Sequence, residues 1–565
     1  MRFLMNIHKR LINNDVSQAL INKGFHPKLA ILYAARDIKN TNNISYELEN
    51  LIPPTSLLSA NSAAKFLAKH IDRKNKIIII GDYDADGATA SACGVLGLKK
   101  FGADVSFIVP NRFKFGYGLT SEIVELAAEK KPDLIITVDN GIASIEGVRN
   151  ARAKGIDVLI TDHHLPADTL PNANFIINPN QPDCKFPSKN LCGVGVIFYL
   201  LLSLRAYYRN KGKFSDSSEP KFSDLLELVC LGTVADLVAL DFNNRILVNA
   251  GMKKMRTGMG NYGIRAIAKL SKKNISEIKT SDLSFSIAPK LNAAGRLADM
   301  SLGIKCLISE TQDEALLYAR QLISLNDQRR SIETGMLETA LDLVKVTSNI
   351  NYSITLFNAN WHQGVIGIIA SRIKEKYYRP TIIFAKDDNG LLKGSGRSIP
   401  SFHLRDALDL VSKAYPEIIV TFGGHAMAAG LTIKEEDFNN FSEVFERTAN
   451  KLLSEDDLNL TVEVDNSILD DGLDCKIVNL INKEVWGQGF PPPLFLDEFN
   501  VISQRIIAKK HSKLYLSKDE VNYDAIFFNN DETQPDRIRA IYSIEVNDFN
   551  GVRSIQIMIK SILNE

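Results

Sequence analysis

The stretch KIIIIGDYDADGAT, residues 76–89, decides the fold of this chain. Its four consecutive isoleucines, Ile77–Ile80, are typical of a strand that is buried on both faces, as in a parallel sheet. A glycine ends the apolar run, and Asp82, Asp84 and Asp86 follow before an alanine-rich segment that suits a helix. Carboxylates this close repel one another, so a cluster at a buried strand end needs a cation. The stretch therefore predicts a metal site at the end of a parallel strand.

Three other interpretations of the same letters stay open at this point. D-x-D-x-D-G also opens an EF-hand loop, but Cys93 stands at the twelfth position where a bidentate Glu is needed, and a strand precedes the loop where a helix should. Asp84-Ala-Asp86 also fits the nucleophile motif of haloacid-dehalogenase phosphatases, in which one Asp becomes covalently modified. The simplest alternative is an acidic turn in which Asp86 caps a helix.

Length and composition fit a multi-domain globular protein. At 565 residues the chain is too long for one core, so we expect three or four domains. Its six cysteines form no C-x-x-C pair, which disfavours disulfides and structural zinc and fits a reducing cytosol. No segment approaches the ~20 consecutive apolar residues of a membrane span, and the N-terminus lacks the apolar run of a signal peptide. A net charge of +1 gives no global attraction for nucleic acid, so a polyanion must bind through local patches and metals.

From residue 76 to about 180, apolar strands alternate with helical stretches. Strands are expected at 76–81, 104–109, 133–138, 156–161 and 175–177, with helices such as 119–131 and 144–155 between them. This alternation predicts a parallel sheet with right-handed crossovers. Three of the strands are followed by acidic or imidazole side chains: the Asp82 cluster, Asp139, and the pair His163-His164. Ligands of open α/β sheets collect beyond the carboxyl ends of the strands, so we expect these groups to meet at one edge.

Three further candidates follow this region. Asp236 comes after the helical segment 222–232, just past a glycine-containing break; alone it suits a cap or a turn, and only the other acids make it a candidate ligand. Asn292 and Arg296 stand in an Ala/Gly-rich turn. Arg296 suits either a phosphate contact or a surface salt bridge.

A long helix is predicted next. A capping box at Thr311 starts it, and apolar residues at helical spacing continue it to about Val346, over about 50 Å. Its polar middle, residues 326–331, predicts that the helix bridges two domains.

A second α/β unit starts near residue 352 and carries three segments that suit anions. The first contains Arg397 and Ser398 beside glycine amides, and the second is Gly423-Gly424-His425, whose amides are expected at a helix start. In the third, His362 and a nearby glycine precede a further helix. Each segment also suits ordinary turn chemistry, but three in one domain favour phosphate binding.

The final segment, from about residue 460, alternates like short strands and predicts a small β-barrel. A local strip of basic residues would have to provide any nucleic-acid contact there: Arg505, Lys509, Lys510 and Lys513. Aromatic residues suited to base stacking are Tyr515, Tyr523, Phe527 and Phe528, although alternate ones must serve the core.

The candidate ligands together suit one or two divalent cations. They are Asp82, Asp84, Asp86, Asp139, His163 and Asp236. An oxygen-rich set with some histidine favours Mn²⁺ or Mg²⁺. Two ions about 3.5–4 Å apart would polarise a phosphodiester and hold a hydroxide in line with the leaving oxygen. His164 is expected to point elsewhere and to donate to the scissile phosphate.

The motifs GDYDADG, VDNG, TDHH and GTVAD, in this order and spacing, resemble the four motifs of the DHH phosphoesterase superfamily. The later segments WHQGVIGIIASRI, SGRS and GGHAMAAG resemble its DHHA1 domain. With PKLNAAGRL between them and VWGQGFPPPLF before a β-rich tail, nearly the whole chain is similar to the RecJ family of single-strand-specific exonucleases. The haloacid-dehalogenase interpretation leaves TDHH unexplained and is set aside.

The resemblance implies hydrolysis of single-stranded DNA from the 5′ end to mononucleotides in DNA repair and recombination, with Mn²⁺ or Mg²⁺ as cofactor. It implies that the tail is an OB-fold and that Arg397 and Gly423-Gly424-His425 hold phosphates near the 5′ end. A RecQ-type helicase and a single-strand-binding protein are the expected partners of a cytoplasmic, monomeric enzyme. Two positions differ from the family pattern: Ile80 stands where many relatives have His, which leaves open whether Asp82 is a ligand, and Lys290 stands where Arg is expected.

The implied domains are a helical segment (1–70), a DHH domain (71–270), a connecting region with the long helix (271–350), a DHHA1 domain (351–455) and an OB-fold (456–565). Other DHH enzymes hydrolyse short oligoribonucleotides, cyclic dinucleotides or pyrophosphate, but the β-rich tail argues against them. A non-catalytic DNA-binding scaffold would have lost its metal ligands, whereas this chain keeps them.

Overall fold

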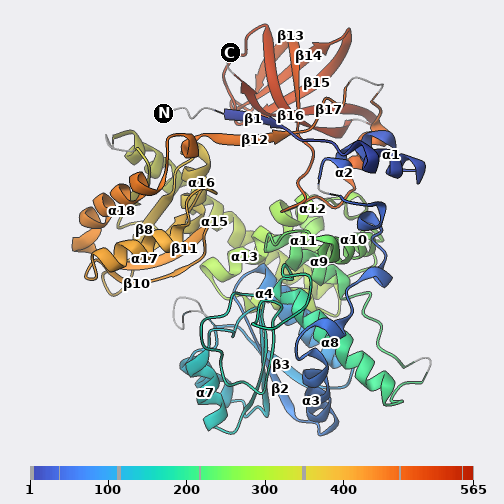
Figure 1. Ribbon diagram of the computed structural model, residues 1–565, viewed down its shortest axis with the longest axis vertical. Helices are drawn as coiled ribbons and strands as arrows, with labels where there is room; N and C mark the ends of the chain where they lie inside the picture. The colour runs from blue at the N-terminus through green and yellow to red at the C-terminus, as the bar shows by residue number, and fades with distance from the viewer. Residues whose placement is uncertain are drawn as a thin grey trace. The chain divides into compact units, whose positions relative to one another are not determined.

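A computed structural model describes residues 5–36, 38–110, 116, 118–215, 218–346, 351–469, 473–549 and 551–563 (Figure 1). The chain forms two compact units. The small unit consists of Met1–Lys9 and Asp327–Val464, and the large unit consists of Arg10–Asn326 and Asp465–Glu565. Among the described helices, none has the length and apolar character needed to cross a membrane.

The large unit contains a five-stranded parallel sheet in the order β3-β2-β4-β5-β6. Its strands are β2 (Lys76–Gly81), β3 (Asp104–Ile108), β4 (Leu134–Val138), β5 (Asp157–Thr161) and β6 (Phe175–Ile177). The predicted strands and their parallel pairing are confirmed. The chain adds β3 on one side of β2 and β4 on the other, so the winding direction changes at the carboxyl end of β2. Such a switch point is where open α/β sheets bind ligands.

The isoleucine run explains why the sheet is covered on both faces. Ile77 and Ile79 belong to the core formed with α3 (Ala60–Asp72), α4 (Ala85–Lys99) and α8 (Gly193–Asn210). Ile78 and Ile80 face a separate core formed with α6 (Ser121–Ala128) and α7 (Ile145–Ala153). All four side chains are fully buried, as expected when successive strand residues point to opposite, equally covered faces.

Further helices surround this sheet in sequence. The N-terminal segment forms α1 (Asn14–Asn22) and α2 (Pro27–Ala34). After α8 come α9 (Leu226–Ala235), α10 (Phe242–Arg256), α11 (Tyr262–Leu270), α12 (Thr280–Asp282), a π-helical turn η5 (Leu283–Ile287), α13 (Ala288–Leu297) and α14 (Ser301–Ile308). Asn292 and Arg296 were predicted to stand in a turn, and this prediction was wrong, because both lie in α13. A proline in the first helical turn and three alanines favour the observed helix α13.

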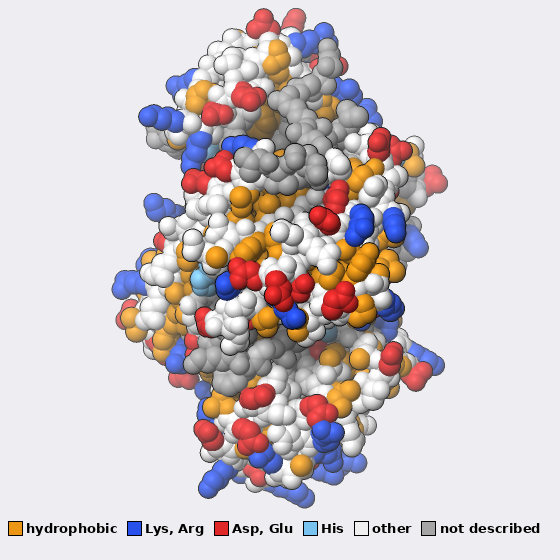
Figure 2. Space-filling model, turned by 90° about the vertical axis from the view of Figure 1, so that its left-hand side faces the viewer, with side chains coloured by type: hydrophobic (Ala, Val, Ile, Leu, Met, Phe, Trp, Pro, Cys, Tyr) orange, Lys and Arg blue, Asp and Glu red, His pale blue; other side chains and the backbone are white. Residues whose placement is uncertain are grey.

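The C-terminal part of the large unit is a closed barrel in the order β13-β14-β15-β17-β16, preceded by α19 (Cys475–Asn482). Its strands are β13 (Phe495–Ile507), β14 (His511–Lys518), β15 (Val521–Phe528), β16 (Arg537–Phe549) and β17 (Val552–Leu563). The predicted barrel is confirmed, although β13 was not among the predicted strands. Tyr523 belongs to the barrel core, whereas Tyr515 and Phe528 are exposed. On the face drawn in Figure 2, acidic and basic side chains are interspersed, in line with the net charge of +1.

The small unit contains a mixed sheet in the order β10-β11-β9-β8-β7, in which only β7 and β8 pair in parallel. Its strands are β7 (Ile354–Phe357), β8 (Thr381–Lys386), β9 (Leu391–Arg397), β10 (Ile419–Gly424) and β11 (Ala428–Lys434), and its helices are α16 (Ile366–Tyr377), α17 (Leu404–Ala414) and α18 (Phe438–Leu452). The N-terminal strand β1 (Met5–Lys9) also belongs to this unit, because it pairs in parallel with β12 (Leu460–Val464).

The predicted long helix is confirmed as α15 (Gln312–Val346), which contains 35 residues. Thr311 Oγ1 accepts a hydrogen bond from the Glu314 backbone N–H at 3.3 Å, as expected of an N-cap. The division between the two units falls between Asn326 and Asp327, within the polar middle of the helix. The predicted domain boundary after residue 350 falls beside residues 347–350, which lie outside the described residues.

A buried ion pair ties the N-terminal helices to the segment that leads into the barrel. Arg36 donates to both carboxylate oxygens of Asp465, at 2.9 and 2.8 Å, and both side chains are at most 3% exposed. The guanidinium also donates to the Pro491 carbonyl at 2.7 Å and lies 5.0 Å from the centre of the Trp486 ring. Nearly every polar atom of the pair is therefore satisfied, which a buried charge requires.

Removing only one partner of this pair should be costly. We expect Arg36→Met to lower the free energy of unfolding of the large unit by about 3–5 kcal/mol, because Asp465 is left buried and uncompensated. The double variant Arg36→Met/Asp465→Asn should recover most of that loss in urea unfolding followed by circular dichroism. Equal losses in the single and double variants would show that charge compensation is not what the pair provides.

Candidate metal centre

The carboxyl ends of three parallel strands deliver the predicted ligands. Asp82 follows β2, Asp84 is the N-cap of α4, and Asp86 lies in the first turn of that helix. Asp84 Oδ1 accepts the Gly87 N–H at 3.0 Å, and a Cβ on Gly87 would lie 2.6 Å from the Asp82 carbonyl oxygen. The turn is therefore too tight for any residue but glycine at that position, and it keeps the three aspartates close together.

Six predicted ligands come together in overlapping groups. The groups are Asp82–Asp84–Asp139, Asp86–His163–Asp236 and Asp139–His163–His164, and in each the possible ligand atoms lie within 4.8 Å of one another. His163 Nε2 is 3.1 Å from Asp139 Oδ1 and 3.7 Å from Asp236 Oδ2. Because Asp139 and His163 are shared, the groups form one cluster. Asp82 belongs to this cluster. Ile80, which stands where many relatives have a histidine, is instead part of the hydrophobic core.

Burial and mutual repulsion act in the same direction on these carboxyl groups. Burial, followed by the charge of Asp84, raises the pKa of Asp86 to about 7. Burial and the charges of Asp86 and Asp84 raise the pKa values of Asp139 and Asp236 well above their usual range. A divalent cation relieves this repulsion, and carboxylates with an imidazole are the donor set of Mn²⁺ and Mg²⁺ sites. The residues present therefore fit such an ion.

His164 has a carboxylate partner of its own. Its Nδ1 lies 2.7 Å from Asp162 Oδ1, and Asp162 also accepts the backbone N–H groups of Ile142, His163 and His164. Burial opposes the charged imidazolium, but the hydrogen bond and charge of Asp162 outweigh it and raise the pKa of His164 to about 9. His164 was expected to point away from the ligands, yet its ring centre lies 4.5 Å from that of His163. His164 therefore lies within the cluster, and its raised pKa favours the charged imidazolium at neutral pH.

Two helices approach the carboxylates closely, and sequence reasoning missed both contacts. At the start of α8, the N–H groups of Gly193 and Val194 donate to the two Asp86 oxygens at 2.6 and 3.0 Å. A Cβ on Gly193 would lie 2.5 Å from the Asp139 Cβ, and one on Gly232 would lie 2.7 Å from Asp86 Oδ1. The only signal in the sequence is a Gly-x-Gly at the start of a long apolar helix.

The two remaining ligands occupy special backbone positions. Asp139 has a left-handed backbone (φ 62°), and its N–H donates to the Thr161 carbonyl at 3.1 Å. A non-glycine residue in this region is strained, which is common where a side chain must be aimed at a site. Asp236 is the C-cap of α9, which continues through Gly232 without the predicted break. Gly232 stands within the helix because any side chain at this position would clash with Asp86.

Helix α13 supports the aspartate turn. Asn292 Oδ1 accepts the Ala85 N–H at 2.7 Å, and a Cβ on Gly295 would lie 1.9 Å from the Tyr83 carbonyl oxygen. Asn292 therefore contacts protein backbone within the turn that carries Asp84 and Asp86. Arg296 lies in the last turn of the same helix.

The predicted anion-binding residues lie in the small unit. Arg397 ends β9 and donates to the Gly396 carbonyl at 2.7 Å, and a Cβ on Gly367 would lie 3.0 Å from Arg397 Nη2. The guanidinium therefore lies beside the first turn of α16. His362 precedes that helix, and its Nδ1 accepts the Gly364 N–H at 3.0 Å. Ser398 is buried, and its hydroxyl donates to a backbone carbonyl at 2.6 Å.

The segment Gly423-Gly424-His425 was predicted to open a helix, and this prediction was wrong. Gly423 and Gly424 end β10, and the alanine-rich residues after them form β11. His425 N–H donates to the Ala428 carbonyl at 2.8 Å within the connecting turn. Pairing of β11 with both β9 and β10 overrides the helix propensity of alanine.

Three family profiles match separate parts of this sequence. The DHH family, N-terminal domain, matches residues 76–233, the DHHA1 domain matches 349–451, and the RecJ OB domain matches 464–561.

Similar proteins match over most of the chain. The single-stranded-DNA-specific exonuclease RecJ of Haemophilus influenzae is 44% identical over 98% of this chain and 97% of that protein. The protein of the same name from Escherichia coli is 41% identical over 95% of this chain and 96% of that protein. The crystal structure of RecJ in complex with Mn²⁺ from Thermus thermophilus covers 100% of this chain and 80% of that chain, at 26% identity and a TM-score of 0.82.

Asp139→Asn should separate the electrostatic cost of the cluster from its metal binding. In chelator at pH 8, we expect the variant to melt a few degrees above the parent protein, because the raised pKa of Asp139 shows that its charged form is unfavourable in the native state. Added Mn²⁺ should raise the melting temperature of the parent but not of the variant. An ion that binds only the native state stabilises it by about 2.7 kcal/mol at 100 times its Kd.

Asp168→Asn, a change of an exposed aspartate, is the matched control and should leave both values unchanged. A Mn²⁺ shift that persists in Asp139→Asn would contradict the ligand assignment.

The pH dependence of the stability of the metal-free protein has a defined sign, because the pKa of Asp86 rises from 3.8 in the unfolded chain to about 7 in the native state. The native state then holds a proton that the unfolded state has lost, so metal-free stability should fall as pH rises from about 4 to 7.

Proposed function

We propose, because this chain belongs to the RecJ family of single-stranded-DNA-specific exonucleases, that it is a metal-dependent exonuclease acting on single-stranded DNA. It degrades the strand from the 5′ end to mononucleotides in DNA repair and recombination. The observation that carries this proposal is the convergence of five aspartates and His163 at the rim of the parallel sheet. Such a cluster suits phosphodiester hydrolysis by a metal-activated water, a mechanism that needs no side-chain nucleophile.

Most residues of the cluster are proposed to bind the cations, and His164 is proposed to donate a hydrogen bond to the substrate. When bound, Mn²⁺ or Mg²⁺ polarises the phosphodiester and lowers the pKa of the attacking water. The cations would be held by six side chains: Asp82, Asp84, Asp86, Asp139, His163 and Asp236. His164, charged at neutral pH through its contact with Asp162, donates a hydrogen bond to a phosphate oxygen of the scissile group. Asn292 keeps the aspartate turn in place through the Ala85 N–H.

Further residues are proposed to bind the strand itself. In the small unit, Arg397 beside the start of α16 suits a phosphate, since a guanidinium and helix N–H groups both attract anions. His362, Ser398, Gly423, Gly424 and His425 belong to the same proposed 5′-phosphate site. In the large unit, Arg296 is proposed to contact phosphate, and the barrel to grip the strand.

The partners and location follow as proposals from the chemistry of the substrate. An enzyme that needs a single strand must receive it from an unwinding activity, so a RecQ-type helicase and a single-strand-binding protein are the proposed partners of a monomer. All six cysteines are free thiols, which supports a cytoplasmic location.

One digestion tests this function directly. A long single strand labelled at either end is incubated with the protein in Mn²⁺, Mg²⁺ or chelator. We expect the 5′ label to appear at once as a mononucleotide, the 3′ label to stay on a shortening strand, and chelator to stop both. A blunt duplex degraded as fast as the single strand, or oligonucleotides as first products, would contradict the proposal.

His163→Ala should lower the cleavage rate by more than about 100-fold, because the cluster loses a ligand that two of its groups share. Strand binding in chelator should change by less than about threefold. His8→Ala, a change of an exposed histidine in the small unit, is the matched control. Parent-like turnover in His163→Ala would refute the assignment.

A further inference from the structure

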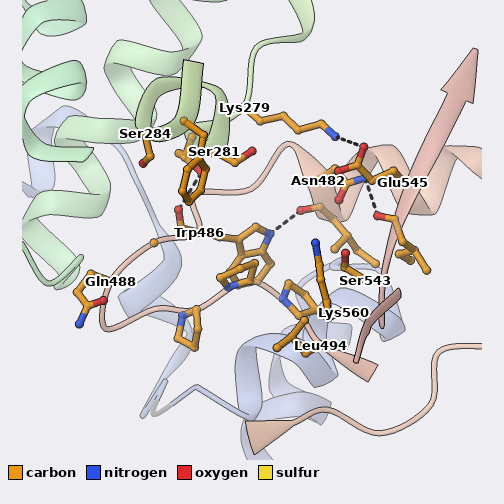
Figure 3. A pocket seen from close by; sticks show the side chains of 18 of the residues that line it. Lys279, Ser281, Ser284, Asn482, Trp486, Gln488, Leu494, Ser543, Glu545 and Lys560 are labelled. Carbon is orange, nitrogen blue, oxygen red and sulfur yellow. Dashed lines mark hydrogen bonds and ion pairs between the residues drawn. The ribbon is translucent and has the colours of Figure 1, made fainter. Parts of the chain in front are cut away.

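A pocket of about 450 Å³ in the large unit is used by none of the residues above (Figure 3). Four stretches of the chain line it: Leu237 after α9, residues 279–285 at α12 and η5, residues 481–495 from the end of α19 to the start of β13, and residues of barrel strands β16 and β17. Its volume falls within the range of small-molecule sites, about 300–1,000 Å³. It is large enough for a nucleotide-sized group.

The walls of the pocket are fixed by hydrogen bonds between these segments. Thr280 Oγ1 donates to the Trp486 carbonyl at 2.8 Å, and Trp486 Nε1 donates to the Ile481 carbonyl at 2.7 Å. Asn482 Nδ2 donates to the carbonyl of Ile544 on β16 at 3.2 Å. Figure 3 shows Trp486 at the centre of this arrangement, between the side chains of residues 279–284 and those of the barrel. The pocket is therefore largely preformed.

Two large apolar side chains at this pocket are exposed to solvent. Phe285 is 81% exposed and lies on the π-helical turn η5. Leu237 is 63% exposed and has a left-handed backbone (φ 61°). π-Helical turns are frequent at functional sites, and strained non-glycine residues cluster there. An exposed aromatic ring on a short helical turn is the kind of platform on which bases stack.

One edge of the pocket is adjacent in sequence to a predicted ligand of the metal centre. Leu237 immediately follows Asp236, and Ser284 Oγ donates to the Val234 carbonyl at 3.4 Å, in the last turn of α9. The wall of the pocket and a predicted ligand thus belong to one hydrogen-bonded segment.

The charges around the pocket favour an anionic group. Lys279 pairs with Glu545 at 3.7 Å, and Figure 3 shows this pair at one edge. Lys560 on β17 is exposed and makes no ion pair with any described residue. Lys560 therefore supplies one positive charge, unpaired among the described residues, beside the apolar side chains of the pocket. A base attached to a sugar phosphate matches both features.

We propose that this pocket is a nucleobase subsite for the single strand, in which one base stacks on Phe285 and an adjacent phosphate contacts Lys560. The subsite rests on the proposed function, since it takes single-stranded DNA as the ligand. Every base has a π face, so stacking here holds the strand without selecting a sequence. The subsite would bind the strand through a base and a phosphate, independently of the contacts proposed for the 5′ phosphate.

The test compares strands that contain bases with strands that lack them. The full-length protein is held in chelator to prevent cleavage, and the dissociation constant is measured by fluorescence anisotropy. We expect Phe285→Ala to weaken binding of an ordinary oligonucleotide by about 5- to 150-fold, the range of one base–aromatic stack. On an oligonucleotide with a tract of abasic sites, the same variant and the parent should bind equally. Phe285→Trp should bind the ordinary strand like the parent.

The control is Leu11→Ala, which removes an 86% exposed apolar side chain outside the pocket and should leave binding unchanged. Unchanged binding of the ordinary strand by Phe285→Ala would overturn the proposal. So would an equal loss on both oligonucleotides, since the ring would then support the fold or the backbone contact. Digestion of the ordinary strand by the parent is measured in parallel. If the parent digests DNA but shows no Phe285 effect, only the subsite fails; if it binds with base dependence but does not digest, only the nuclease function fails.

The phosphate contact has a separate readout. Lys560→Ala should reduce the slope of log K against log salt concentration by about 0.7, the value for one phosphate of a single strand. Phe285→Ala should leave that slope unchanged, because stacking releases no counterions. An unchanged slope in Lys560→Ala would overturn the contact between Lys560 and phosphate.

Discussion

Five carboxylates held around one histidine at the end of a buried sheet repel one another, and much of the large unit is arranged around that repulsion. Asp86 receives two backbone N–H groups from the start of α8, and Asp84 receives one from its own helix. Asn292 holds the turn from outside through the Ala85 amide. Neutral backbone donors lower the free-energy cost of the buried charges, and they do not repel a cation from the carboxylates as positively charged side chains would.

This constraint explains why the sheet and its helices lie so close together at one edge. α8 and α9 reach the carboxylates only because Gly193 and Gly232 carry no Cβ. Asp139 accepts a strained backbone so that its side chain points to the same place. The pocket with Phe285 includes Leu237, which directly follows Asp236, the predicted ligand at the end of α9. The proposed subsite and the proposed metal site therefore share one short segment of the chain.

Much of this could be predicted from the sequence, because the signals were local. Four adjacent isoleucines are typical of a strand covered on both faces, and parallel strands bring their carboxyl ends to one edge. The contacts of Gly193 with Asp86 and Asp139 could not be predicted, since they join segments more than fifty residues apart. Alanine and glycine misled in the small unit for the same reason. A Cβ on Gly394 of β9 would lie 2.5 Å from the ring of Phe384 on β8, so this glycine is needed for the packing of the two strands.

The path of the chain through the two units has a consequence for proteolysis. The chain passes between units after Lys9, Asn326 and Val464, and β1 pairs with β12 beside the first and third of these points. A protease that cuts α15 in its middle would leave two fragments, and each unit would still contain parts of both. The two fragments would remain associated without a covalent link, so a single peak in size-exclusion chromatography would not mean an intact polypeptide.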